Sequence, residues 1–396
     1  MERIGIYGGT FNPPHIGHIG AAKYALDSLK LRKLLVIPSC ISPHKKIPAD
    51  SPTPQQRMEM LQLALQDEEN IEVSDLELRR GDRSYTYETV EQVRQLYPQA
   101  ELILFMGTDM FLSFDSWKNP DRILQNASLG VFYRGDPKEK QQIDEKKAYF
   151  EAQGARIYLV ENPVTQISST DLRRMLVFDC AQPFLHPGVG EYIREKGLYG
   201  NGKHYCGLSL DELEQAVISL LKPNRVAHVL GCRQTAKELA LVYGADPTDA
   251  QRAALLHDIT KALDGPLQLT LCREYGINLD DFSAQNPKTL HALTGSLVAQ
   301  RIFGENDRVV AAICSHTTGK ANMNTLEKII YVADYMEPNR DFPGVEDLRK
   351  LAYTDLDSAM IMGLEMTLSL LREQGREVSP DSQKALSYLK NSGKRE

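Results

Sequence analysis

Two histidines near the N-terminus follow a glycine-rich turn, and these residue types together suit phosphate binding. The string comprises Gly8, Gly9, Thr10, Phe11, Asn12, Pro13, Pro14, His15, Ile16, Gly17 and His18. Glycine lets the backbone approach an anion closely, and free amide groups at a helix start face that anion. His15 and His18 stand three residues apart, so both rings lie on one face of a helix or tight turn. We therefore expect both rings to reach the same triphosphate.

A second set of chemically capable residues lies in the other half of the chain. It consists of His228, His257, Asp258, His291, His316 and Asp334. A single His-Asp dipeptide is most often a surface pair, and a single histidine is more often a helix-start or core residue than a ligand. Four histidines and two aspartates in one region are more informative, because such a set can hold a metal ion.

The elements expected around the first string alternate between strands and helices. Apolar runs predict strands at 3–7, 34–38, 101–106, 128–133 and 156–160, with helical segments such as 53–66 and 138–152 between them. This alternation indicates an α/β, Rossmann-like fold with a mainly parallel sheet and helices on both faces. Ligands of such sheets bind beyond the carboxyl ends of the strands, where the glycine-rich string falls.

A polar joint, Gly200-Asn201-Gly202-Lys203, ends this alternating pattern. Beyond it, helical runs begin at Ser209, Pro223 and Pro247, and strand-like patterns disappear. We expect a first domain over 1–199, a linker at 200–206 and an all-helical domain over 207–396.

Composition excludes several classes of protein. Of the 396 residues, 42% are hydrophobic and 25% are charged, as in ordinary soluble proteins. No basic and apolar leader is evident, and no apolar run nears the roughly 18 residues of a membrane helix, so we expect a cytoplasmic protein without membrane contact. The net charge of −7 argues against a nucleic-acid binder. The cysteines are scattered, which favours neither a disulfide framework nor a thiolate zinc site: Cys40, Cys180, Cys206, Cys232, Cys272 and Cys314.

Further strings in the first half resemble one branch of the nucleotidyltransferase superfamily. They are Pro43-His44-Lys45, Arg57, Ser84-Tyr85-Thr86, Gly107-Thr108-Asp109, Trp117 and Ile167-Ser168-Ser169-Thr170-Asp171-Leu172-Arg173. Together they look like bacterial nicotinate mononucleotide adenylyltransferases over residues 1–199. The resemblance implies transfer of AMP from ATP, accompanied by Mg²⁺, to nicotinate mononucleotide, with release of pyrophosphate.

This resemblance assigns roles to most of these strings but none to Arg57. The ATP-binding residues are Gly8, Gly9, Thr10, Asp109, Ser168, Ser169 and Thr170, and those for nicotinate mononucleotide are Thr86, Trp117 and His44. Simpler interpretations exist, because serine and threonine at a helix start most often cap it, Asp109 can also be a cap, and a lone tryptophan is usually core.

The chemistry of adenylyl transfer suits these residue types. Phosphate attacking phosphate needs alignment and cationic stabilisation but no protein nucleophile, and alignment alone supplies about 7–11 kcal/mol. We assign His15 and His18 to the triphosphate, with His18 on the reacting phosphorus. Lys45 and Arg173 would neutralise the outgoing pyrophosphate. The tetrapeptide His15-Ile16-Gly17-His18 also resembles class I aminoacyl-tRNA synthetases, but their lysine-rich second signature is missing.

The second half resembles the HD superfamily of metal-dependent phosphohydrolases. The strings Leu256-His257-Asp258-Ile259-Thr260-Lys261, His316-Thr317-Thr318-Gly319 and Ala333-Asp334-Tyr335-Met336-Glu337-Pro338 point to the symmetrical diadenosine tetraphosphatases, over about 207–390. By this resemblance the fold is an all-α HD type. A general nucleotidase, an alarmone hydrolase and a nucleotide-sensing module without hydrolysis remain alternatives.

The HD resemblance also implies a ligand set. One ion is expected at His228, His257, Asp258 and Asp334, and Asp258 can bridge to a second ion at His291 and His316. Such ligands suit iron or manganese, and one or two ions remain open. Lys261 and Arg340 are the candidates for neutralising substrate phosphates. Oligomeric state, coupling between the sites and strictness for nicotinate over nicotinamide are left open by the sequence.

Overall fold

The chain forms two compact units, which span residues 1–202 and 203–396. The computed structural model describes residues 2–40, 51–81, 85–133, 137–161, 167–201, 203 and 205–392. None of the helices in these ranges is long and apolar enough to cross a membrane.

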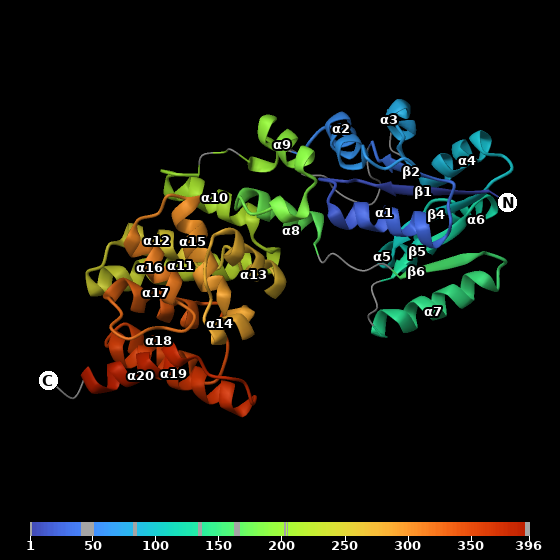
Figure 1. Cartoon of the computed structure of the whole chain (residues 1–396). Coiled ribbons are helices and arrows are strands. Elements are labelled where there is room, and N and C mark those ends of the chain that lie inside the picture. The colour runs from blue at the N-terminus through green and yellow to red at the C-terminus, as the bar shows by residue number, and fades with distance from the viewer. Residues whose placement is uncertain are drawn as a thin grey trace. The chain divides into compact units, whose positions relative to one another are not determined.

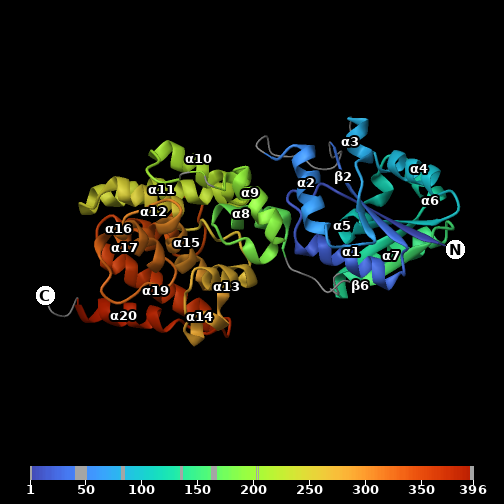
Figure 2. The ribbon, with the colours of Figure 1, turned by 45° about the horizontal axis from the view of Figure 1, so that its top comes forward.

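A parallel sheet of six strands forms the centre of the described part of the first unit (Figures 1 and 2). Its strands are β1 (Arg3–Gly9), β2 (Lys33–Pro38), β3 (Ile71–Val73), β4 (Glu101–Gly107), β5 (Ser128–Tyr133) and β6 (Ile157–Glu161). Their order is β3-β2-β1-β4-β5-β6. The direction of winding therefore changes between β1 and β4, and ligands of such sheets bind beyond the strand ends at that point.

Helices cover both faces of this sheet (Figures 1 and 2). The α-helices described in this unit are α1 (Ile16–Ser28), α2 (Pro54–Leu65), α3 (Leu76–Arg80), α4 (Thr86–Leu96), α5 (Thr108–Leu112), α6 (Pro120–Asn126), α7 (Pro137–Glu151), α8 (Ser169–Val177) and α9 (Pro187–Glu195). The expected α/β fold class is confirmed. Five of the strands match predicted ones, whereas β3 was not expected.

The core of this unit follows the alternation of side chains along each strand. Ile4 and Ile6 on β1 point to one face, where they pack in a buried cluster with Val90 of α4. Gly5 between them faces the other side, where an added Cβ atom would lie 2.4 Å from the Leu34 side chain. A larger residue at position 5 would therefore displace the buried side chains of Leu31 and Leu34, which glycine leaves in place.

The described part of the second unit consists of helices without strands (Figures 1 and 2). They are α10 (Leu210–Leu220), α11 (Pro223–Tyr243), α12 (Pro247–Leu256), α13 (Gly265–Glu274), α14 (Asp281–Gln285), α15 (Leu290–Arg301), α16 (Asp307–Ser315), α17 (Thr325–Met336), α18 (Val345–Ala352), α19 (Leu356–Glu373) and α20 (Pro380–Ser392). The predicted start signals are used as expected, since Ser209 and Glu212 form a capping box at α10, and Pro223 and Pro247 occupy first positions. The all-helical class is confirmed.

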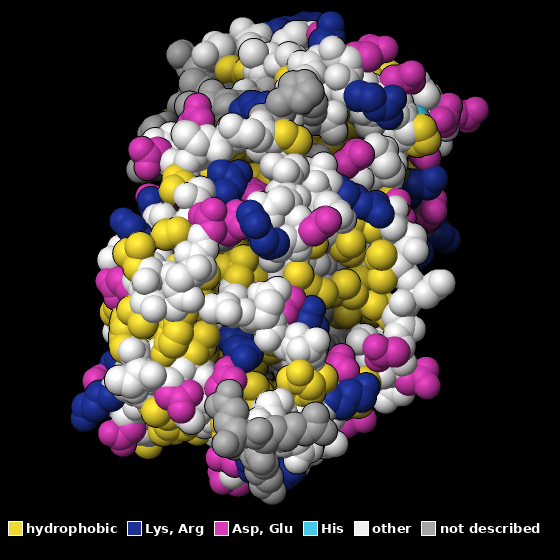
Figure 3. All heavy atoms as spheres, turned by 90° about the vertical axis from the view of Figure 1, so that its left-hand side faces the viewer, with side chains coloured by type: hydrophobic (Ala, Val, Ile, Leu, Met, Phe, Trp, Pro, Cys, Tyr) yellow, Lys and Arg dark blue, Asp and Glu magenta, His cyan; other side chains and the backbone are white. Residues whose placement is uncertain are grey.

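The charged side chains of both signs are interspersed over the face drawn in Figure 3. Hydrophobic side chains lie between the charged ones, and neither sign of charge forms a continuous area on this face. This face therefore carries no broad basic surface of the kind that binds nucleic acid.

Candidate active sites

The glycine-rich loop leaves β1 at the switch point of the sheet. Gly8 and Gly9 are the last residues of β1, and a Cβ atom added to Gly8 would meet nothing within 4 Å. The backbone there is open to a ligand. His15 precedes the first residue of α1, so the loop delivers its histidines at a helix start, where amide groups face outward.

His15 and His18 lie against each other, as their spacing predicts. Their ring centroids are 3.7 Å apart, with 31° between the ring planes. Burial lowers the pKa of His15 to about 4, so this ring is neutral at pH 7. A neutral imidazole offers a phosphate a hydrogen bond, whereas positive charge must come from other residues.

Arg173 supplies such a charge beside the loop, although it lies far along the chain. One of its guanidinium nitrogens donates to the Asn12 carbonyl at 2.9 Å, and another donates to Thr170 Oγ1 at 3.1 Å. The Tyr199 hydroxyl donates to Asn12 Oδ1 at 2.7 Å. Arg173 and Thr170 of the predicted ATP site are thus brought to the glycine-rich loop.

The other predicted ATP residues lie at the starts of two helices. Asp109 is exposed in the first turn of α5, directly after β4, which is the neighbour of β1. Ser168 accepts a hydrogen bond from the Asp171 amide at 3.1 Å, so it does cap α8, and Ser169 is the first residue of that helix. Capping leaves the other amide groups at the start of α8 free to face an anion.

The predicted nicotinate side of the site lies between two segments. Trp117 is half-buried and packs on Phe114 with ring centroids 5.3 Å apart. The Lys118 ammonium lies 3.8 Å from the centroid of the Tyr85 ring. Tyr85 directly precedes Thr86, the first residue of α4. Trp117 and Thr86 therefore belong to adjacent segments. His44 and Lys45 lie outside the described residues.

The predicted metal ligands of the second unit converge from five helices. They are His228 on α11, His257 and Asp258 after α12, His291 on α15, His316 after α16 and Asp334 on α17. All are buried except Asp334, whose side chain is 23% exposed. These residues are far apart in the sequence, and the packing of the helices brings them together.

Asp258 lies between two pairs of histidines. Its Oδ2 atom is 3.8 Å from His228 Nε2 and 3.6 Å from His257 Nε2. Its Oδ1 atom is 3.5 Å from His291 Nε2 and 3.9 Å from His316 Nε2. The two oxygens of one carboxylate thus face two halves of the centre, which is the arrangement of a bridging ligand.

Each of the four rings is held in one tautomer. The acceptors of the Nδ1 atoms are the Ala254 carbonyl for His257 (2.7 Å), the Ile313 carbonyl for His316 (2.7 Å), the Lys288 carbonyl for His291 (2.9 Å) and the Glu337 carboxylate for His228 (3.1 Å). These oxygens only accept, so each Nδ1 atom carries a hydrogen, and the Nε2 atoms of His257, His291 and His316 present lone pairs. This is how metal-bound histidines are oriented.

The Nε2 atoms of the four histidines face one another in pairs, and a cation held between them would stabilise this arrangement. The Nε2 atoms of His228 and His257 are 3.3 Å apart, and those of His291 and His316 are 3.2 Å apart. Burial lowers the pKa of His257 and His291 well below the usual range and that of His316 to about 4, so these three rings are neutral. The residues therefore fit a divalent metal ion.

Comparison with known proteins identifies both units. The cytidylyltransferase-like family model matches residues 6–175, and the HD domain model matches residues 225–339. A Borrelia garinii subsp. bavariensis protein named probable nicotinate-nucleotide adenylyltransferase is 36% identical over 205 residues, which are 52% of this chain and 98% of that protein. A Halalkalibacterium halodurans protein named symmetrical bis(5'-nucleosyl)-tetraphosphatase is 41% identical over 170 residues, which are 42% of this chain and 90% of that protein. The chain belongs to both families, the cytidylyltransferase-like family with its first unit and the HD family with its second, and joins them in one polypeptide.

These two relatives confirm, for both halves, the resemblance expected from the sequence. A solved structure from Clostridium acetobutylicum, described as a predicted HD superfamily hydrolase involved in NAD metabolism, is 37% identical to this chain. It has a TM-score of 0.46 and covers 47% of this chain and 98% of that chain. Membership of the HD family implies divalent metal binding, which the cluster of histidines and aspartates in the second unit fits.

Cationic side chains surround the centre of the HD domain. Lys261 Nζ lies 2.8 Å from His291 Nε2 and 4.0 Å from Asp258 Oδ1. Arg340 donates to Asp334 Oδ1 at 2.8 Å, and Arg225 forms an ion pair with Asp258. The sequence pointed to Lys261 and Arg340 but not to Arg225, which lies in the first turn of α11.

Two residues that the sequence analysis names only within motifs, without a role, act on partners that are distant in the chain. Arg57 is 1% exposed and donates to the Thr10 carbonyl at 2.6 Å and to the Ser39 carbonyl at 2.7 Å, so it pins the glycine-rich loop to β2. Glu337 was noticed only as part of a string, yet it orients His228. Burial of a charged residue beside a motif would indicate a functional role. A single sequence does not show which residues are buried.

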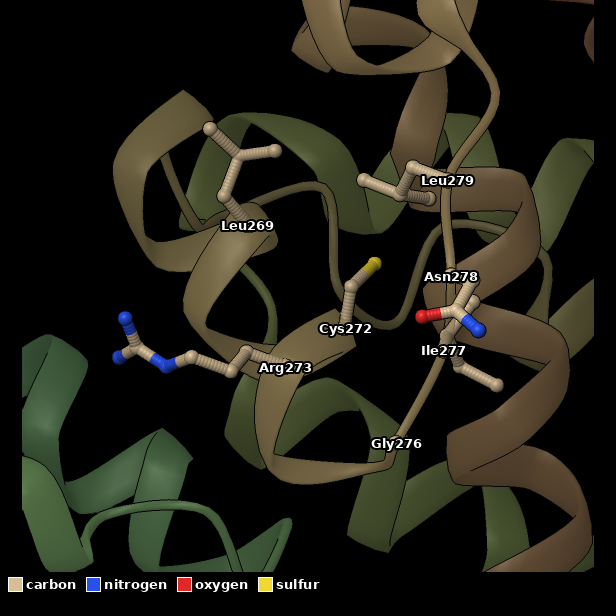
Figure 4. A pocket seen from close by; sticks show the side chains of 7 residues that line it. All are labelled: Leu269, Cys272, Arg273, Gly276, Ile277, Asn278 and Leu279. Atoms are coloured by element: carbon tan, nitrogen blue, oxygen red, sulfur yellow. The ribbon is translucent and has the colours of Figure 1, made fainter.

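A separate pocket of about 330 Å³ lies at α13 and the segment after it (Figure 4). Cys272 points into it between Leu269 and Leu279, while the Arg273 side chain points away (Figure 4). None of the predicted ligands of the HD domain lines this pocket.

Proposed function

We propose that the chain is a bifunctional enzyme. Residues 1–199 transfer AMP from ATP, accompanied by Mg²⁺, to nicotinate mononucleotide, giving deamido-NAD and pyrophosphate. Residues 207–396 hydrolyse diadenosine tetraphosphate symmetrically to two ADP, with iron or manganese as the metal. The cytoplasmic location expected from the sequence stays a prediction.

The first activity rests on the convergence of His15, His18 and Arg173 at the switch point of the sheet. A relative 36% identical over nearly its full length carries the name nicotinate-nucleotide adenylyltransferase. In the proposed reaction an oxygen of the nicotinate mononucleotide phosphate attacks the α-phosphorus of ATP, and the bond to pyrophosphate breaks. No protein atom forms a covalent bond, so the residues act by alignment and charge.

Each residue of the first site then has a distinct task. His18 hydrogen-bonds the reacting phosphate, and neutral His15 hydrogen-bonds the neighbouring one. Arg173 and Lys45 carry the positive charge that the leaving pyrophosphate needs. Trp117 stacks on the nicotinate ring, with Thr86 and His44 beside the same nucleotide. Gly8, Gly9, Thr10, Asp109 and the serines and threonine at 168–170 hold ATP.

The second activity rests on the position of Asp258 between two histidine pairs. We assign one ion to His228, His257, Asp258 and Asp334, and a second to Asp258, His291 and His316. A divalent ion held by these residues would lower the pKa of a coordinated water toward 7 and so supply the hydroxide nucleophile. Lys261, Arg340 and Arg225 are placed to neutralise the phosphates of a bound substrate.

Product analysis tests both activities in the intact protein. The iron- or manganese-loaded protein is incubated with diadenosine tetraphosphate, and separately with ATP and nicotinate mononucleotide. ADP alone, lost in His257→Ala but kept in His18→Ala, is the expected result for hydrolysis, and adenylyl transfer should show the reverse pattern. AMP plus ATP from diadenosine tetraphosphate would reject symmetrical cleavage. A protein that binds metal but does not turn over this substrate would instead be another phosphohydrolase or a nucleotide sensor.

A further inference from the structure

A tyrosine from the end of the first unit reaches the glycine-rich loop. Tyr199 lies in the short 3-10 helix η3 (Leu198–Gly200), which packs against α8 and α9. Its backbone has φ 58° and ψ 26°, in the left-handed region that residues other than glycine rarely adopt. The side chain is nevertheless buried, with 8% of its surface exposed. A residue held in this conformation with a buried side chain indicates a contact that the fold retains.

That contact is with Asn12, in the middle of the glycine-rich string. The Tyr199 hydroxyl donates to Asn12 Oδ1 at 2.7 Å, and Asn12 is itself buried. Burial raises the pKa of Tyr199 above its ordinary value, against the opposing effect of Arg173 and Arg57. The hydroxyl therefore keeps its proton at neutral pH and remains a donor.

Asn12 in turn joins segments that are distant in the chain. Its carbonyl accepts from the Arg173 guanidinium at 2.9 Å, and its Nδ2 atom donates to Ser51 Oγ at 3.2 Å, just before α2. Together with the bond from Tyr199, these contacts use the carbonyl and both ends of the side-chain amide. They fix Asn12 in position, three residues before His15 in the chain.

We propose that Tyr199 is a positioning residue for adenylyl transfer and that it acts through Asn12. Its hydroxyl holds Asn12, which in turn holds the glycine-rich loop against the Arg173 guanidinium. Displacement of Asn12 would move the loop with His15 and His18 relative to the charge of Arg173, and alignment of such groups lowers the barrier to phosphoryl transfer. This inference rests on the first activity of the proposed function. It goes beyond that activity because neither Tyr199 nor Asn12 belongs to the nucleotide-binding residues proposed above.

Steady-state kinetics of the full-length protein test this role. Tyr199→Phe removes only the hydroxyl, and Tyr158→Phe is the matched control. The Tyr158 hydroxyl also donates at 2.7 Å, to Glu101 Oε1, but this pair lies near the starts of β6 and β4, at the opposite end of the sheet from the glycine-rich loop. The kcat and the KM for ATP are measured with nicotinate mononucleotide as second substrate, and the Kd of ATP alone is measured by calorimetry. Urea unfolding followed by Trp117 fluorescence gives the folded fraction of each variant.

We expect kcat/KM for ATP to fall about tenfold in Tyr199→Phe and to stay within about twofold of the wild type in Tyr158→Phe, because only the first hydroxyl holds the loop. ATP alone should bind about three- to tenfold more weakly to Tyr199→Phe. These effects should appear under conditions in which urea unfolding shows both variants to be folded. Wild-type kinetics in Tyr199→Phe, or an equal loss in Tyr158→Phe, would overturn the proposal.

A double-mutant cycle with Asn12→Leu tests whether Tyr199 acts through Asn12. Asn12→Leu alone should lose at least as much kcat/KM as Tyr199→Phe, so the test remains decisive even if Tyr199→Phe does not fold. Addition of Tyr199→Phe to Asn12→Leu should cause no further loss. A full second loss, or wild-type kinetics in Asn12→Leu, would contradict a role through Asn12.

The same measurements separate this inference from the proposed function. A wild type that binds ATP but does not transfer AMP to nicotinate mononucleotide would overturn that activity alone. The ratio of the ATP Kd values of Tyr199→Phe and the wild type would then decide the role of Tyr199, and equal values would refute it. A wild type that binds no ATP would overturn the activity and the positioning role together.

Discussion

At the scale of single residues, the two sites use histidine in different ways. In the first unit, burial keeps His15 neutral beside His18, and the charge is left to Arg173. In the second unit, an acceptor on Nδ1 turns each ring so that its Nε2 atom faces the centre. The first arrangement suits hydrogen bonding to phosphate, and the second suits metal binding.

Glu337 should matter for metal affinity although it is not itself a ligand. Its carboxylate accepts from His228 Nδ1 at 3.1 Å and from the Asn339 amide and side chain at 2.8 Å each. A glutamine offers one acceptor oxygen to these donors, so Glu337→Gln should weaken metal binding by about 10–100-fold. Competition with a chelator measures this. Glu305→Gln, which removes a buried carboxylate that pairs with Arg252, should leave metal affinity unchanged.

His15 should make the first unit less stable in mild acid. Its pKa is about 4 in the folded protein against 6.5 when unfolded, so the unfolded chain binds a proton that the folded chain refuses between pH 6.5 and 4. Stability from a neutral His15 is therefore complete above pH 6.5 and declines as the pH falls toward 4. Between pH 7.5 and 5.0 the loss amounts to about 2 kcal/mol.

Urea unfolding of the wild type and of His15→Asn isolates this contribution, because all other titrating groups cancel in the difference. The single tryptophan, Trp117, reports the first unit alone. The stability difference between the two proteins should shift by that amount, in favour of the variant at pH 5.0. A difference independent of pH would show that His15 is not desolvated in the folded state.

At the scale of elements, function sits where strands and helices end. The glycine-rich loop follows β1, and Arg57 of α2 holds it through the Thr10, Ser39 and Cys40 carbonyls. Arg57→Met would leave these part-buried acceptors without the buried guanidinium, so we expect a loss of about 3 kcal/mol in stability. The loosened loop should also raise the KM for ATP.

Arg94 provides the control for Arg57. It donates to the Ala100 carbonyl at 2.7 Å and to the Asn126 carbonyl, and thus makes the same kind of contact away from the loop. Arg94→Met should destabilise the unit without changing the KM for ATP. Equal KM effects in the two variants would indicate general unfolding rather than loss of a positioned loop.

The elements that the sequence predicts are those with a strong local signal. Buried parallel strands such as β4 read as apolar runs, and Ser209 and the helix-start prolines mark helices through their own backbone chemistry. Strand β3 has three residues, of which Glu72 is exposed, so no run distinguishes it from a loop. The candidate metal ligands could be predicted because four histidines and two aspartates follow one another in a recognisable order along the chain. Arg57 and Glu337 act through partners that only folding brings close.

At the scale of the whole molecule, the two activities are proposed for units with separate cores. One unit is built on a sheet and the other on helices alone, and each closes its own set of contacts. Units of about 200 residues are large enough to fold alone. The proposed active sites also draw all their described residues from one unit each.

Fragments 1–202 and 203–396 should therefore fold independently, because cutting the chain between them removes no core. Far-ultraviolet circular dichroism should show that the spectra of the fragments sum to that of the intact chain, and each fragment should unfold cooperatively. The first fragment should keep the tryptophan transition of the full-length protein, since Trp117 lies within it. The second should bind metal with the affinity of the intact chain, because its predicted ligands lie between His228 and Asp334. A fragment that lost its helical signal or its metal affinity would place essential contacts across the joint and contradict separate folding.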